Sequence, residues 1–248
     1  MRRLPMGPWM RFAVLVIKPL LLLLTRRDWR GQENVPATGG VILAANHISH
    51  ADPLTLADYV IFGLHRVPRF MAKDTLFKGN GLVGRVMRGA KQIPVYRRTA
   101  DASLALRDAV QALDRGECVV IYPEGTVSRD PDKWPMAAKT GVARLALLSG
   151  APVVPVAQWG PERILDSYRD GGFRPLPPKR VQVVAGPPVD LSAYRGRELS
   201  ADVLRDATTE VMKALRSMLE DLRGERAPET FFVHDPKGVR TTQDRRSA

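Results

Sequence analysis

His47 and Asp52 are five residues apart, and their types and spacing could support acid–base chemistry. An alcohol is a poor nucleophile at neutral pH, and a neutral imidazole can accept its proton as the oxygen attacks a carbonyl carbon. The imidazole then needs a group that orients its other nitrogen and balances its growing charge, and a carboxylate one turn away can do both. This H-x4-D spacing is common by itself, and a loop histidine without a catalytic role is its more usual explanation.

Two further segments carry groups that suit an anion. The segment 122–128, Tyr-Pro-Glu-Gly-Thr-Val-Ser, follows an apolar run; its glycine permits close backbone approach, and its Thr and Ser offer hydroxyl and amide donors. The segment 93–98 ends in Arg97 and Arg98, whose planar guanidinium groups suit bidentate phosphate contacts. Taken alone, the first reads as a turn and the second as a solvated basic face.

The elements that must position these groups alternate between strands and helices. Apolar runs predict strands at 41–45, 67–73, 91–95, 118–122, 153–157 and 181–185. Helical periodicity predicts helices at 53–62, 101–114, 137–148 and 203–222, the last with Ser200 as its N-cap. This alternation predicts one α/β domain over 31–223, with a central mixed sheet flanked by helices. The His47–Asp52 loop would connect the first of these strands to a helix.

The net charge of +12 is concentrated in two windows. Residues 1–30 hold seven Lys or Arg against one Asp, a net charge of +6, and residues 66–98 hold nine against one, a net charge of +8. The first window surrounds the apolar run 12–24, which is too short and too interrupted by Lys18-Pro19 for a comfortable membrane span. We therefore expect residues 1–30 to include a hydrophobic helix that associates with a membrane surface, with a buried core helix as the alternative. Residues 224–248 are polar and predict a loosely ordered tail.

Read in order, the blocks at 46–52, 93–98, 122–128 and 153–156 resemble those of the glycerophosphate acyltransferase family, which includes the bacterial 1-acylglycerol-3-phosphate acyltransferases. The resemblance covers roughly residues 30–190 and extends to Ala72-Lys73 and to Lys139-x-Gly141. It implies that His47 is the general base and Asp52 its orienting partner. It also implies a substrate-binding set in which Arg97 binds a phosphate and Pro155 shapes the pocket wall; the other members are Lys73, Glu124, Gly125, Thr126 and Lys139.

The resemblance implies transfer of a fatty acyl group from acyl-CoA or acyl-carrier protein to lysophosphatidic acid, which would form phosphatidic acid for phospholipid biosynthesis. No cofactor and no metal is expected, and membrane lipids are the expected partners at the cytoplasmic face of the membrane. The sequence departs from the family pattern at Val127, where an arginine is usual, and at Tyr96, where an acidic residue is usual. The acceptor therefore stays open, with glycerol-3-phosphate, another lysolipid or a glycolipid as alternatives.

Two other classes of protein fit parts of the sequence. A nucleic-acid-binding protein would explain the basic windows, but few aromatic residues are interleaved with the Lys and Arg of 66–98, so no nucleic-acid partner is expected. A metal-dependent hydrolase could use His47, His50, Asp52 and Glu124 as ligands, although four histidines in the whole chain make a multi-histidine site unpromising. The single cysteine, Cys118, lies in an apolar run and predicts a buried strand residue rather than a nucleophile.

Overall fold

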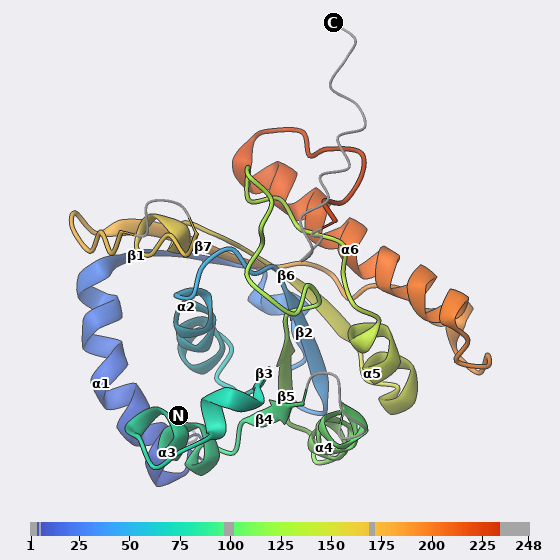
Figure 1. The fold of residues 1–248 in the computed structure, drawn as a ribbon, viewed down its shortest axis with the longest axis horizontal. Helices are drawn as coiled ribbons and strands as arrows, with labels where there is room; N and C mark the ends of the chain where they lie inside the picture. Colours follow the sequence, from blue (N-terminus) through green and yellow to red (C-terminus); the bar gives the residue numbers. More distant parts are fainter. Residues whose placement is uncertain (1–3, 5, 97–101, 169–171, 234–248) are drawn as a thin grey trace, which may run out of the picture.

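A seven-stranded mixed sheet organises the part of the chain that the computed structural model describes, which is residues 4, 6–96, 102–168 and 172–233 (Figure 1). Its strands lie in the order β1-β7-β6-β2-β5-β3-β4, and every neighbouring pair is parallel except β6 and β7. Their bounds are β1 Thr25–Arg30, β2 Val41–Ala45, β3 Pro68–Lys73, β4 Ile93–Val95, β5 Cys118–Ile121, β6 Val153–Trp159 and β7 Lys179–Ala185. The predicted α/β domain with a mixed central sheet is confirmed.

Helices cover both faces of this sheet. One apolar core lies beneath α4 (Ala102–Asp114), α5 (Gly141–Ser149) and α6 (Ala201–Arg223), and the other lies beneath α2 (Asp52–Asp58) and the π-helical turn η2 (Tyr59–Gly63). Figure 1 shows α4, α5 and α6 on one side of the strands and α2 on the other. Short 3-10 turns complete the chain: η1 Gln32–Asn34, η3 Asp74–Phe77, η4 Pro161–Arg163 and η5 Ser192–Tyr194.

The central strands explain where a site can form. Strand β2 is buried along its whole length, as expected for a parallel strand covered on both faces, and it lies between β5 and β6. After β2 the chain crosses to β3 on one side, whereas β6 lies on the other side, so the connections diverge at the carboxyl end of β2. Open α/β sheets bind ligands in the crevice at such a point. The loop that holds His47 starts there.

Two elements lie outside the predicted set. Strand β1 has the sequence Thr-Arg-Arg-Asp-Trp-Arg, which carries no apolar run, and it joins the sheet as an edge strand through backbone pairing with β7. Helix α3 (Leu82–Gly89) is short and contains two glycines. In addition, α5 begins at Gly141 rather than near residue 137; the amides of Ala137 and Lys139 donate to the carbonyls of Phe232 and Pro123 (both 2.9 Å).

Helix α1 (Pro8–Leu24) lies at the edge of the molecule beside α3 (Figure 1). The two helices meet closely, because a side chain at Gly89 would collide with the indole of Trp9. The outward side of α1 exposes large apolar side chains: Phe12, Leu15, Val16, Leu20, Leu22 and Leu23. No helix in the described residues is long and apolar enough to cross a membrane. Residues 1–30 thus contribute both this helix and strand β1, and the domain boundary placed at residue 30 stays a prediction.

Candidate active site

His47 and Asp52 form a hydrogen-bonded pair at the carboxyl end of β2. The Nδ1 atom of His47 lies 2.9 Å from Oδ2 of Asp52, whose side chain is fully buried, while 13% of the His47 side chain is exposed. The same Oδ2 accepts the backbone N–H groups of Ile48 (2.6 Å) and Ser49 (2.8 Å). The loop therefore wraps around the carboxylate, which fixes Nδ1 of the imidazole and leaves Nε2 as the nitrogen available to a substrate.

An aromatic ring holds the imidazole from one side. Tyr122, the first residue after β5, stacks on His47 with ring centroids 4.2 Å apart and an angle of 18° between the planes. Phe70 of β3 lies beyond it, with its ring centroid 6.4 Å from that of Tyr122. Burial raises the pKa of the Tyr122 phenol well above its ordinary value, so this ring stays neutral at physiological pH. The sequence placed Tyr122 in a motif but gave it no role.

A buried polar network fixes the start of the loop. Asn46 and Gln158 exchange two hydrogen bonds: the Asn46 side-chain amide donates to the Gln158 carbonyl (3.0 Å), and the Gln158 N–H donates to Asn46 Oδ1 (2.7 Å). Thr55 of α2 donates its hydroxyl proton to Oε1 of Gln158 (3.1 Å). These contacts tie the ends of β2 and β6 to α2. No sequence signal marks Gln158, which is 112 residues from Asn46.

Glu124 lies behind the same loop. It is 3% exposed; its Oε1 accepts the backbone N–H of His47 (3.0 Å), and its Oε2 accepts that of Met136 (2.9 Å). Burial raises the pKa of this carboxyl to about 8, although the two N–H groups act in the opposite direction.

A cavity of about 1050 Å³ opens in front of His47. Its wall is mainly apolar and is built by α1, α2, β3, η3, α3 and α4, with side chains that include Met10, Leu54, Phe70, Leu76, Met87 and Leu106. Three cationic residues, Lys73, Lys139 and Arg144, also line it. Such a cavity combines room for a long apolar chain with positive charge for an anionic group, and its volume is slightly above the ~300–1,000 Å³ typical of ligand sites.

The predicted substrate-binding residues divide into three groups. Lys73, Gly125, Thr126 and Lys139 line the cavity. Gly125 has a φ of +70°, a left-handed conformation that favours glycine, and the stem of Lys139 lies against this turn.

The second group, Glu124 and Pro155, does not line the cavity, so Pro155 does not form the pocket wall as predicted. Pro155 lies within β6, where the amide of Gly186 donates to its carbonyl (2.9 Å). The third is Arg97, which lies outside the described residues.

Two departures from the family pattern also have defined places. Val127 lines the cavity and is 2% exposed, so an apolar side chain fills the position where an arginine is usual. Tyr96, the other departure, also lines the cavity. Arg129, two residues after Val127, lies over the ring of Tyr168, 4.4 Å from its centroid, and is not one of the cavity-lining residues. Arg144 had no predicted role, and only its basic side chain, three residues after the Lys139-x-Gly141 block, distinguished it in the sequence.

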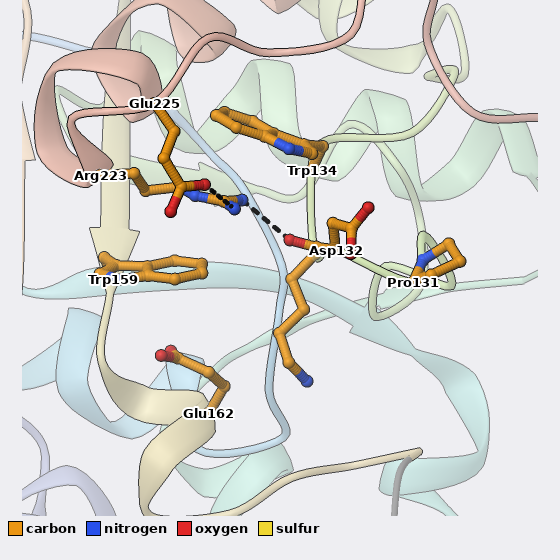
Figure 2. A pocket seen from close by; sticks show the side chains of 8 residues that line it. Pro131, Asp132, Trp134, Trp159, Glu162, Arg223 and Glu225 are labelled. Atoms are coloured by element: carbon orange, nitrogen blue, oxygen red, sulfur yellow. Dashed lines mark hydrogen bonds and ion pairs between the residues drawn. The ribbon is translucent and has the colours of Figure 1, made fainter. Parts of the chain in front are cut away.

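A second, shallower pocket of about 490 Å³ lies by the end of α6 (Figure 2). Arg223 lies between the rings of Trp134 and Trp159, with its guanidinium carbon 3.7 Å and 4.5 Å from their centroids. It also donates to the carbonyl of Asp132 (2.8 Å) and to the carboxylate of Glu225 (2.6 Å). In neither pocket, over the described ranges, do three or more His, Cys, Asp or Glu side chains lie close enough to hold a metal ion.

Comparison with known proteins places these features in a family. The acyltransferase family model matches residues 26–159, which hold His47, Asp52 and Glu124. The 1-acyl-sn-glycerol-3-phosphate acyltransferase of Bacillus subtilis is 26% identical over 216 residues, 86% of this chain and 99% of that protein. The N-acylphosphatidylethanolamine synthase of Arabidopsis thaliana is 29% identical over 165 residues, 60% of this chain and 56% of that protein.

A solved structure agrees with these matches. The crystal structure of the 1-acyl-sn-glycerophosphate (LPA) acyltransferase of Thermotoga maritima superposes with a TM-score of 0.62 at 26% identity, covering 86% of this chain and 82% of that one. The chain therefore belongs to the acyltransferase family and is an O-acyltransferase.

Proposed function

We propose that the protein transfers a fatty acyl group from a thioester, acyl-CoA or acyl-carrier protein, to the free hydroxyl of 1-acylglycerol-3-phosphate, which forms phosphatidic acid. The observation that carries this proposal is the His47–Asp52 pair (2.9 Å) at the wall of a large apolar cavity that also holds Lys73 and Lys139. Relatives named as 1-acyl-sn-glycerol-3-phosphate acyltransferases support the choice of acceptor.

In this mechanism His47 acts as the general base. Its Nδ1 is held by Asp52, so Nε2 takes the proton from the acceptor hydroxyl as that oxygen attacks the thioester carbonyl carbon. The tetrahedral intermediate collapses, the C–S bond breaks, and the imidazolium returns its proton to the departing thiolate. Asp52 balances the charge on the imidazolium while it exists. The acyl group thus moves in one addition and elimination, without a covalent acyl-enzyme.

The cavity suits both ends of the substrates. Each methylene group of an acyl chain that leaves water for an apolar wall gains about 0.8 kcal/mol. The ammonium groups of Lys73 and Lys139 would meet the acceptor phosphate and the phosphates of the acyl carrier. Because Val127 places an apolar side chain where an arginine is usual, we assign the phosphate contact mainly to Lys139 beside the Gly125–Thr126 turn.

We further propose that the enzyme works as a peripheral or monotopic protein at the cytoplasmic face of a membrane. The outward side of α1 exposes apolar side chains, of which Leu15 is 74% exposed, and residues 1–30 carry a net charge of +6. An apolar helix face bordered by cations is suited to the boundary between anionic headgroups and acyl chains. Met10 and Ala13 of the same helix line the cavity, so the membrane contact would lie beside the substrate.

The proposal is tested by an acyl-transfer assay on the purified protein with acyl-CoA or acyl-carrier protein as donor. The acceptors are 1-acylglycerol-3-phosphate, glycerol-3-phosphate, a lysophosphatidylethanolamine and a glycolipid, and the product position is mapped. We expect the first acceptor to be preferred and His47→Ala to lose activity. His65→Asn is the matched control, because His65 is exposed and its φ of 54° suits asparagine. Near-wild-type transfer by His47→Ala would exclude the mechanism.

A further inference from the structure

The carboxyl group of Glu124 connects two segments that are far apart in sequence. One oxygen accepts the N–H of His47, and the other accepts the N–H of Met136. The carbonyl of His47 in turn accepts the N–H of Ser128 (2.7 Å). The backbone N–H and the backbone carbonyl of His47 are thus both bonded to residues of the segment 124–136, while its side chain is bonded to Asp52.

The direction of the Glu124 side chain excludes it from the cavity wall. Its neighbours Pro123 and Gly125 line the cavity, whereas Glu124 does not and is 3% exposed. Its two oxygens accept the backbone N–H groups of His47 and Met136. A phosphate in the cavity therefore has no access to this carboxyl group.

The segment on the far side of Glu124 is itself firmly held. We call residues 128–137 the clasp loop. The hydroxyl of Ser128 donates to the carbonyl of Trp134 (2.7 Å), and the amide of Ala137 donates to the carbonyl of Phe232 (2.9 Å). Trp134 stacks on Arg223 at the end of α6 (Figure 2). The clasp loop is therefore anchored on the C-terminal helix and on the segment that follows it.

We propose that Glu124 is a positioning residue that fixes the backbone of His47 to the clasp loop, and that it does not contact the acyl acceptor. This inference rests on the proposed role of His47 as the general base. A misplacement of a catalytic group by about 1 Å can cost on the order of 10²-fold in rate, so loss of the bond that holds the backbone N–H of His47 is expected to lower the rate. The resemblance to the family had implied that Glu124 belongs to the acceptor pocket.

Glu124→Gln separates the two roles, because both backbone partners are donors. A glutamine keeps one acceptor oxygen and places an NH₂ group against the other N–H, so one bond is lost at almost unchanged volume. We expect kcat to fall by about 10- to 100-fold while the acceptor KM stays within about threefold. Lys139→Gln is the contrasting variant, for which the acceptor KM should rise instead. A tenfold rise in acceptor KM with kcat retained in Glu124→Gln would overturn the proposal.

Hydrogen–deuterium exchange gives a second measurement that does not depend on activity. In Glu124→Gln, peptides that cover 46–49 and 132–137 should exchange faster together, and unchanged exchange in both would overturn the proposal. If Glu124→Gln does not fold, Glu124→Asp keeps the carboxyl group one methylene shorter and is read in the same way. If the wild type transfers no acyl group to any acceptor, the proposed function fails, and the exchange result still decides the role of Glu124.

Discussion

The stack of Tyr122 on His47 makes a quantitative prediction about catalysis. In the proposed reaction the imidazole becomes positively charged, and the face of an aromatic ring attracts a cation by about 0.5–2 kcal/mol, with the larger values at desolvated sites. The rings are 4.2 Å apart and nearly parallel, and His47 is mostly buried, so we take about 1.4 kcal/mol. Tyr122→Leu should therefore lower kcat about tenfold, since this amount corresponds to a factor of ten in rate.

Tyr122→Phe is the control, because it keeps the ring and removes only a hydroxyl whose raised pKa keeps it neutral. We expect its kcat to stay within about twofold of the wild type. The assay is steady-state acyl transfer with saturating donor and a range of acceptor concentrations. Equal losses in Tyr122→Phe and Tyr122→Leu would refute the role of the ring, as would a Tyr122→Leu variant with unchanged kcat.

Three further predictions concern other parts of the molecule. Asp52→Asn should lower kcat by about 10²–10⁴-fold, because an amide oxygen can still accept from the loop but carries no negative charge to balance the imidazolium. Steady-state kinetics on a variant with unchanged circular dichroism measures this, and a loss below tenfold would contradict it. The pKa of the Glu124 carboxyl is 4.5 ordinarily and about 8 in the folded protein, so between these values the folded state binds more protons than the unfolded state. The free energy of unfolding should therefore fall as pH rises from 5 to 8, by on the order of 1 kcal/mol per pH unit. Urea unfolding should show this pH dependence in the wild type and not in Glu124→Gln, and the same pH dependence in both would contradict the prediction. The double variant Leu15→Glu/Leu22→Glu should float with anionic vesicles several-fold less than the wild type. Leu148→Glu is the control, because Leu148 of α5 is also exposed, and its flotation should not fall. Equal flotation of the two variants would argue against membrane contact through α1.

Most of the sheet could be predicted because its central strands are buried on both faces. A strand such as Val41–Ala45 has to be continuously apolar, and such a run is visible in the sequence. Strand β1 escaped prediction because an edge strand needs only backbone pairing on one side and can carry Arg26, Arg27 and Arg30. Helix α3 escaped because eight residues with two glycines carry little helical signal by themselves.

The sequence by itself determined the pair that can do chemistry, because the partners of this hydrogen bond are five residues apart and one loop brings them together. His47 and Asp52 meet at 2.9 Å, as their spacing predicted. Only the tertiary structure decided what surrounds the pair: Tyr122 on the ring, Glu124 on the backbone and Gln158 beneath the loop are 75 to 111 residues from His47 in the sequence. The spatial order of the strands in the sheet brings these residues together, and that order depends on packing between distant segments rather than on any local pattern.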